Sequence, residues 1–93
     1  MEIKLTEKEI WELIGYVKIS PIRMKTLKSL KTEFLMPSEI ARTTGLRTTQ
    51  ISNALSDLKE KNLVICMNET AKKGRIYQNT PLGLEILKRI EQG

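Results

Sequence analysis

The fold of this chain is decided by the stretch Pro37-Ser38-Glu39-Ile40-Ala41-Arg42-Thr43-Thr44-Gly45-Leu46-Arg47-Thr48-Thr49-Gln50-Ile51-Ser52-Asn53-Ala54-Leu55-Ser56. Pro37 favours the start of a helix, and Gly45 has the place of the left-handed residue that ends one. Thr48 can cap a second helix, in which apolar residues recur at helical spacing. The stretch therefore predicts two short helices joined by a tight turn, over residues 37–44 and 49–61.

The residues around this turn suit two helices that cross closely. Ala41 lies where the first helix meets the second, so a larger side chain would hold the helices apart. Leu46, Ile51 and Ala54 are placed to pack the turn. Two short helices joined by three or four residues that include glycine form a helix-turn-helix, whose second helix can enter the major groove of DNA.

Signals outside this stretch predict three more helices and a hairpin. Thr6 with Glu9 has the spacing of a capping box, and the pairs Ser20-Pro21 and Thr80-Pro81 each combine an N-cap residue with a proline. A short apolar run and an alternating segment follow the helix-turn-helix and predict two strands. The predicted fold is mainly α with a small β-hairpin, with helices at about 7–18, 21–31, 37–44, 49–61 and 81–91 and strands at about 63–67 and 75–79.

Composition excludes most catalytic chemistry. The chain has 93 residues, no histidine and one cysteine, Cys66. Without histidine it lacks the commonest general base and metal ligand, and one thiol builds neither a metal cage nor a disulfide. We expect a single domain over residues 1–93 with no enzyme activity, cofactor or metal, and Cys66 as a small buried hydrophobe. The sequence also has no apolar run long enough for a membrane span and no signal peptide, which predicts a cytoplasmic location.

Positive charge is concentrated in two segments of the chain. The net charge is +5, made up of +5 from residues 18–31, +2 from residues 62–79 and −2 from the remainder. This balance makes a polyanion the first partner to consider. A charged stretch is also common on a solvated helix face, so the position of each segment in the fold decides its meaning.

Four stretches carry a resemblance to a known family: residues 20–30, residues 37–46, the run Leu55-x-x-Leu58-x-x-Lys61-Asn62-Leu63-Val64, and the run Tyr77-Gln78-Asn79-Thr80-Pro81-x-Gly83. The first two resemble the second helix of the family and the first helix of its helix-turn-helix motif, with the turn. The third resembles the end of the recognition helix with the first wing strand, and the fourth resembles the second wing strand with the closing helix. The family is the ArsR/MarR-like superfamily of winged helix-turn-helix transcriptional regulators, of archaeal type.

The resemblance implies a winged helix fold, double-stranded DNA as partner and homodimerisation. Asn62 stands where such proteins usually have glycine, and asparagine also tolerates the left-handed conformation. The metal-binding His and Cys residues of arsenical-type sensors are missing, which argues against metal sensing.

The outer face of the predicted recognition helix is rich in amides and hydroxyls and carries no acid between residues 47 and 56. DNA readers place the N-terminal part of this helix in the groove. Gln and Asn suit adenine, and the methyl group of Thr suits that of thymine. The candidates for base contacts are Arg47, Thr49, Gln50, Ser52 and Asn53. The candidates for DNA backbone contacts are Ser38, Arg42, Thr48, Lys72, Lys73 and Arg75.

The first and last helices carry apolar residues away from their main stripes, which favours a contact with a second subunit. The candidates are Trp11, Tyr16, Leu84 and Leu87, although Trp11 can also pack over the last helix of its own chain. The predicted function is a sequence-specific, nucleoid-associated transcriptional regulator that binds double-stranded DNA as a homodimer. Two alternatives remain open, a winged helix protein-interaction or assembly module and a non-specific chromatin protein.

Overall fold

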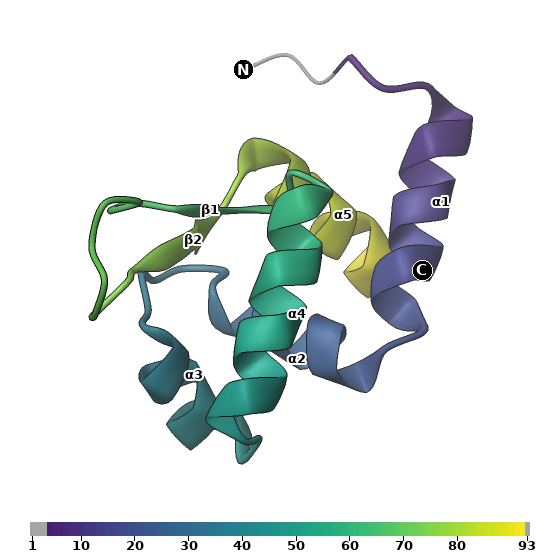
Figure 1. Ribbon diagram of the computed structural model, residues 1–93. Coiled ribbons are helices and arrows are strands. Elements are labelled where there is room, and N and C mark those ends of the chain that lie inside the picture. The colour runs from purple at the N-terminus through teal and green to yellow at the C-terminus, as the bar shows by residue number, and fades with distance from the viewer. Residues whose placement is uncertain (1–3, 93) are drawn as a thin grey trace.

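The computed structural model describes residues 4–92 as five helices and a two-stranded hairpin (Figure 1). The elements follow the order α1 (Glu7–Lys18), α2 (Pro21–Ser29), α3 (Pro37–Thr44), α4 (Thr48–Glu60), β1 (Val64–Cys66), β2 (Tyr77–Asn79) and α5 (Pro81–Gln92). The central helix is α2, which contacts each of the other four helices. The hairpin and α1 lie at opposite sides of the molecule, so the two ends of the fold are free to face different partners.

Most helix boundaries are set by the predicted caps. The Thr6 hydroxyl accepts a hydrogen bond from the backbone of Glu9, and the Glu9 carboxylate accepts one from the backbone of Thr6, both at 3.1 Å. The Ser20 hydroxyl accepts from the backbone of Arg23 at 3.2 Å, and the Thr80 hydroxyl accepts from Gly83 at 3.0 Å. These bonds satisfy backbone N–H groups that have no partner inside the helix.

Two left-handed residues end helices as predicted. Gly45 has φ 75° at the end of α3. Asn62 has φ 61° just after α4, where it occupies the place that glycine usually takes. Both turns are therefore confirmed, and the second shows that asparagine fulfils the conformational requirement at this position.

Four helix boundaries differ from the prediction. The end of α4 at Glu60 and the end of α5 at Gln92 each differ by a single residue. The helix expected to reach residue 31 ends at Ser29, because the backbone of Leu30 leaves helical geometry with its N–H bonded to the Leu27 carbonyl at 3.2 Å. Thr48 was expected to cap the recognition helix but is its first residue. The N-cap is Arg47, whose N–H donates to the Gln50 side chain at 3.0 Å.

The hairpin strands are shorter than the predicted ranges of 63–67 and 75–79. Val64 pairs with Asn79 and Cys66 pairs with Tyr77 in an antiparallel register. Beyond them, the Met67 N–H donates to the Ile76 carbonyl at 2.7 Å, while the Ile76 N–H donates to the Asn68 carboxamide at 2.8 Å. A side chain therefore takes the place of a backbone acceptor at the end of the ladder. The residues between the strands, 67–76, form the wing.

One more segment joins the hairpin. Leu35 forms an antiparallel bridge with Tyr77, which places β2 between Leu35 and β1.

The core collects apolar residues from every helix and from β1. Cys66 is buried as predicted. Leu87, which was expected on a surface for a second subunit, is also fully buried in this core, and that expectation is wrong. The apolar stripe of α5 faces the core over a wider arc than expected, because Ile86 and Leu87 are adjacent in sequence and both have no exposed surface.

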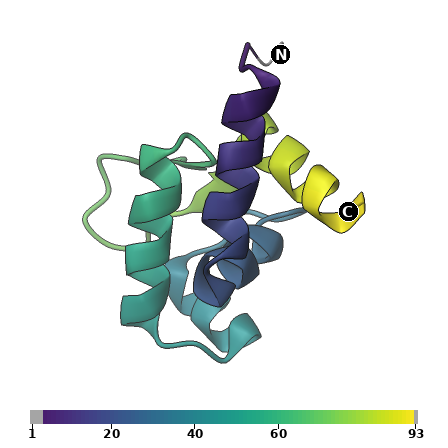
Figure 2. The ribbon, with the colours of Figure 1, turned by 90° about the vertical axis from the view of Figure 1, so that its right-hand side faces the viewer.

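A close approach fixes the start of α5. Gly83 is buried against the chain that leads into β1, where a Cβ atom would overlap the backbone carbonyl of Leu63. Figure 2 looks at α1 face-on and shows α5 crossing on one side of it and α4 on the other. No helix within residues 4–92 has the length and apolar character to cross a membrane.

Candidate nucleic-acid interface

The helix-turn-helix presents one polar face to the outside. In α4, Ile51, Ala54, Leu55 and Leu58 are buried against the other helices. The opposite side, here called the recognition face, consists of exposed residues, namely Thr49, Ser52, Asn53 and Ser56. Arg47 and Thr48 are exposed at the start of the helix, so the structure brings these sequence-predicted residues together on one surface.

Gln50 differs from its neighbours on this helix. It is half-buried, and its side-chain oxygen accepts the hydrogen bond from Arg47 that caps α4. Gln50 and Asn53 also line a shallow hollow of about 160 Å³ between α4 and the start of α2, where Ser20 and Ile22 form the other wall. The sequence indicated a polar residue here but not that half of its amide group is already in use.

Ser38 and Arg42 lie where the sequence placed them, exposed and four residues apart on α3. This spacing puts both side chains on the same side of the helix. Neither Arg42 nor Arg47 forms an ion pair with any residue in the described range 4–92. Their guanidinium groups are therefore free to meet an anion.

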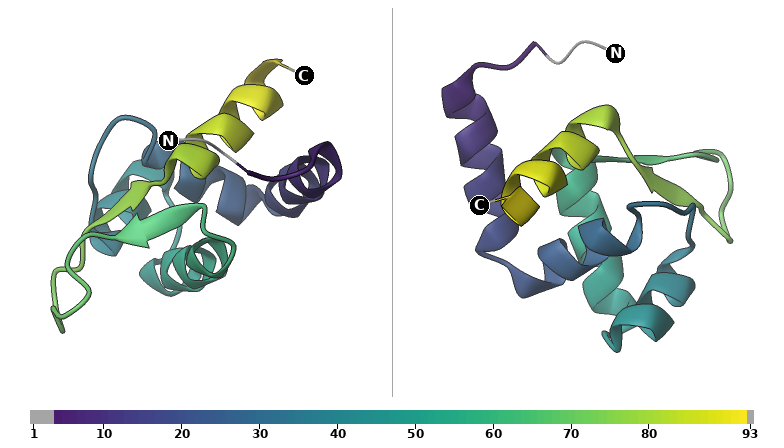
Figure 3. Two further views of the ribbon diagram at one scale, coloured as in Figure 1. Left: turned by 90° about the horizontal axis from the view of Figure 1, so that it is seen from above. Right: turned by 180° about the vertical axis from the view of Figure 1, so that it is seen from behind.

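The wing carries two more exposed cations at its end. Lys72 and Lys73 precede Gly74, whose φ of 67° turns the chain back toward β2. Figure 3 shows from two directions that this loop reaches beyond the helices. The predicted basic tip is thus placed on a projecting element.

Arg75 has a structural task inside the wing. Its guanidinium donates to the carbonyl of Ala71 at 2.9 Å and to that of Glu69 at 3.3 Å. Asn68 adds a hydrogen bond to the Gly74 carbonyl at 3.1 Å. The role of Asn68 was not predicted, because an asparagine in a polar loop does not reveal which backbone groups it will bond.

An ion pair joins the wing to α4. The Lys59 ammonium contacts the Glu69 carboxylate, and this hydrogen bond lowers the pKa of Glu69 and raises the pKa of Lys59. Lys59 lies in the last turn of α4. The element that carries the recognition face and the element that carries the basic tip are therefore directly connected.

Arg23 links three helices. Its guanidinium donates to the Tyr16 carbonyl at 3.0 Å, approaches the Asp57 carboxylate at 3.4 Å, and lies 3.9 Å from the centre of the Tyr16 ring. In the same basic segment, Lys31 pairs with Glu91 at 2.8 Å. Two of the five positive charges in residues 18–31 therefore have acidic partners within the chain, which weakens the case that α2 faces a polyanion.

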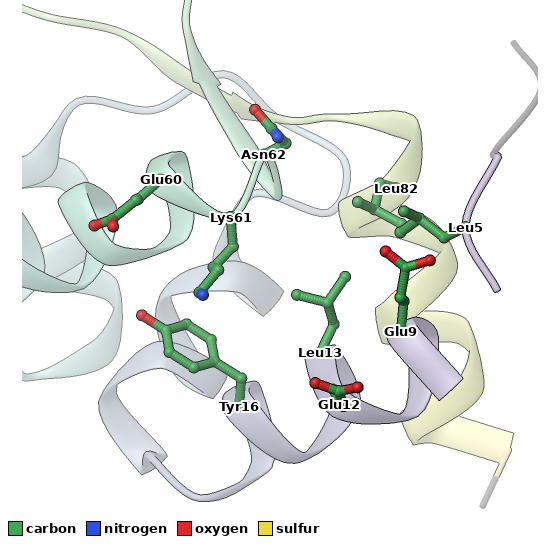
Figure 4. A pocket seen from close by; sticks show the side chains of 9 residues that line it. All are labelled: Leu5, Glu9, Glu12, Leu13, Tyr16, Glu60, Lys61, Asn62 and Leu82. Atoms are coloured by element: carbon green, nitrogen blue, oxygen red, sulfur yellow. The ribbon is translucent and has the colours of Figure 1, made fainter. Parts of the chain in front are cut away.

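The C-terminal end of α4 lies beside a group of acidic residues. A cleft of about 420 Å³ lies between α1 and the C-terminal end of α4, and Figure 4 shows Glu9, Glu12 and Glu60 around it. Tyr16 stands in the same cleft with its ring 5.3 Å from the Lys61 ammonium, and burial raises its pKa. Three carboxylates against one ammonium group would repel phosphate, so this cleft and the recognition face have opposite electrostatic character.

Trp11 and Leu84 remain as candidates for a contact with a second subunit. Trp11 is 63% exposed on α1 and Leu84 is 43% exposed on α5. They lie at two neighbouring hollows that share Lys88 and Gln92 as lining residues. We call Trp11 and Leu84 the terminal-helix patch. Tyr16 is half-buried under Arg23 and contributes mainly to packing within the chain.

Metal chemistry has no support from the side-chain arrangement. Within residues 4–92, His, Cys, Asp and Glu side chains do not gather in any group of three that could hold a metal ion.

Solved structures with this fold include proteins that were crystallised with DNA. TubR from Bacillus thuringiensis serovar israelensis pBtoxis, bound to 24 bp of tubC, superposes with a TM-score of 0.77 at 16% identity, over 98% of each chain. A mutant of MarR from E. coli complexed with operator DNA gives 0.71 at 20% identity, over 92% of this chain and 63% of that chain. The S. aureus MepR–DNA complex gives 0.70 at 18% identity, over 92% and 73%.

These likenesses establish the fold, which is a winged helix-turn-helix. The chain spans less than two thirds of the MarR chain, whereas it matches TubR over nearly the full length of both. No family model and no curated protein matches the sequence. Identity of 16–20% carries no residue roles from one protein to the other, so the function rests on the site itself.

Proposed function

We propose that this protein is a sequence-specific regulator of transcription that binds double-stranded DNA and has no catalytic activity. The observation that carries the proposal is the acid-free recognition face of α4, with exposed cations on either side of it. These cations are Arg42 and Arg47 from the helix-turn-helix and Lys72 and Lys73 from the wing. Phosphates on both sides of a groove and base edges between them match this arrangement.

In the proposed complex, α4 enters the major groove with its N-terminal half. Arg47, Thr49, Ser52 and Asn53 face base edges, and Asn53 is free to bond adenine through both amide atoms. Ser38, Arg42 and Thr48 contact the DNA backbone beside the groove. Lys72 and Lys73 at the tip of the wing follow the backbone or enter the next minor groove, while Arg75 keeps the loop in shape.

The proposal includes a homodimer formed through the terminal-helix patch. A large exposed tryptophan beside an exposed leucine is typical of a protein interface. A two-fold axis through α1 and α5 would set the two recognition helices about one turn of DNA, ~34 Å, apart. Membership of the ArsR/MarR-like superfamily, of archaeal type, is part of the same proposal and rests on the motif resemblance. A protein with this role works at the nucleoid, in the cytoplasm.

Two other functions fit the fold and are distinguished by one experiment. Binding sites are selected from a random duplex pool with the purified protein at two salt concentrations. An enriched palindromic site is the result we expect. Salt-sensitive binding without any enriched sequence would favour a non-specific chromatin protein, and no binding at low salt would favour a protein-interaction or assembly module.

A further inference from the structure

The hydrogen bond that caps α4 changes what Gln50 can offer to DNA. A free glutamine amide has an oxygen that accepts and a nitrogen that donates, and the two together suit adenine. Here the oxygen accepts the Arg47 N–H at 3.0 Å. A backbone N–H can donate only to the oxygen of the amide, so this bond also determines which way the amide group is turned.

The amide nitrogen of Gln50 is left as a free donor. It forms no hydrogen bond to any protein group within residues 4–92, and the residue lines, together with Asn53, the shallow hollow between α4 and the start of α2. Keeping the cap is favourable, because the Arg47 N–H would otherwise lose its partner at the helix start. We therefore infer that Gln50, with its oxygen held at the cap, reads DNA chiefly through its amide nitrogen as a donor and favours a base with a keto oxygen in the major groove, guanine or thymine.

The chemistry of the base edges gives this inference its content. Guanine presents two adjacent acceptors, O6 and N7, and thymine presents the acceptor O4. Cytosine presents only its amino group, so a donor meets a donor there. Adenine accepts one N–H at N7 but sets its own amino group where guanine and thymine have a keto oxygen, so it suits a donating side chain less well. A side chain that donates at one base position can tell which strand carries which base, because every base pair has one keto base and one amino base at its major-groove edge.

Asn53 provides the internal contrast. It is exposed on the next turn of the same helix, and its side-chain amide forms no hydrogen bond in the part of the chain that the structure describes. Both amide atoms of Asn53 are therefore free, and adenine remains its best partner. The two amides, which look equivalent in the sequence, are expected to select different bases.

The inference rests on the proposed function and is tested with Gln50→Glu. A carboxylate at this position still accepts the Arg47 N–H, and it is favourable near a helix N-terminus, so the fold and the cap are kept. Its second oxygen is an acceptor where the wild-type side chain has a donor. Binding-site selection is carried out with the wild type, with Gln50→Glu and with the matched variant Asn53→Asp.

We expect one position in each half-site to change from guanine or thymine to cytosine or adenine in Gln50→Glu. Relative affinities for the two kinds of base should invert by about tenfold at that position. Asn53→Asp should alter a different position and leave this one unchanged. Ratios within one variant are compared, because the added negative charge lowers affinity for all DNA.

Two results would overturn the inference while leaving the proposed function intact. The first is wild-type preference for adenine over guanine and thymine at the position that Gln50→Glu alters, since the bidentate bond that favours adenine needs the side-chain oxygen as an acceptor. The second is an enriched site with no position that responds to Gln50→Glu. Failure of the wild type to select any sequence would instead remove the proposed function.

The cap itself is tested without DNA. Hydrogen exchange of the Arg47 amide should be slow in the wild type and in Gln50→Glu and faster in Gln50→Met, which has no oxygen to accept the bond. Equal exchange in all three proteins would show that the cap is not formed, and the inference that Gln50 reads DNA chiefly as a donor would fail with it.

Discussion

At the scale of single residues, two helical glycines have opposite surroundings. Gly83 is pressed against the backbone of Leu63, whereas a Cβ atom added to Gly15 in α1 would meet no atom of the described residues within 4 Å. Glycine in a helix interior lowers stability when nothing requires it, because its backbone loses more freedom on folding than that of other residues. Only Gly83 has a packing requirement that justifies this loss.

Substitution by alanine should therefore have opposite effects at the two sites. Gly83→Ala is expected to reduce the free energy of unfolding by at least about 2 kcal/mol, since α5 must move away from Leu63. Gly15→Ala is expected to raise it by about 0.5–1 kcal/mol. Urea unfolding of both variants measures this, and a stable Gly83→Ala protein would show that the start of α5 is not fixed by this contact.

Residues that act through local backbone conformation can be predicted from the sequence, and residues that act through distant partners cannot. Gly45 and Asn62 are left-handed as predicted, because a helix end requires that conformation locally. The ion pair of Arg23 was not predicted, since its partner Asp57 lies 34 residues away in the chain. For Gln50 the sequence indicated a polar residue near the start of α4 but not the capping hydrogen bond that its oxygen accepts.

At the scale of elements, the wing is the most exposed part of the proposed DNA interface. Replacing Lys72 and Lys73 together by alanine should weaken binding to all sequences and flatten the dependence of log K on log salt. Each lost phosphate contact changes the slope by about 0.9. Binding is measured by fluorescence anisotropy over a range of salt concentrations.

A matched pair on α2 controls for the loss of charge itself. Lys25 and Lys28 are exposed, and replacing both by alanine removes two positive charges, as the wing variant does. We place α2 away from the DNA. The slope should stay unchanged in this variant. If the wing variant keeps the wild-type slope, the wing has no place in the interface.

The ion pair between the wing and α4 predicts a dependence on pH. The pKa of Glu69 is lowered in the folded protein by its bond to Lys59, so the pair stabilises the wing above about pH 4.3, the usual pKa of a glutamate. This contribution is lost as pH falls through the lower, folded pKa. Amide exchange in residues 67–76 should therefore accelerate below that range in the wild type more than in Glu69→Gln, in which the ion pair is already absent.

The lengths of these elements were less predictable than their order. All five helices and both strands were expected, since caps and apolar spacing are local signals. At the wing end, backbone pairing stops after the bond from the Met67 N–H to the Ile76 carbonyl, because the Asn68 side chain accepts the backbone N–H of Ile76. An alternating sequence does not indicate where a side chain will take over a backbone hydrogen bond and end a strand.

At the scale of the whole molecule, charge is arranged on two sides. Free cations flank the recognition face and lie on the wing, while the cleft between α1 and the C-terminal end of α4 carries Glu9, Glu12 and Glu60. The sequence shows the net charge and the two segments in which positive charge is concentrated. It did not predict that ion pairs neutralise part of α2, because those pairs form only when distant helices pack together.

The terminal-helix patch predicts the oligomeric state. The wild type should sediment as a dimer at micromolar concentration, and Trp11→Ala with Leu84→Ala should shift it to a monomer, because these are large apolar side chains left exposed in one chain. Phe34→Ala is the matched control, since Phe34 is 57% exposed but lies outside the patch. A wild type that is monomeric both free and on DNA would contradict the dimer.

The hydrogen bonds inside the wing affect how much conformational entropy the loop loses when it binds a partner. Asn68 and Arg75 hold the loop in one conformation through bonds to its own backbone. A floppy loop that becomes ordered on meeting a partner loses about 1–2 kcal/mol of backbone entropy for each residue that it fixes. In this protein the loss occurs when the chain folds, so the wing meets its partner as a rigid body whose association is limited by orientation and charge rather than by ordering.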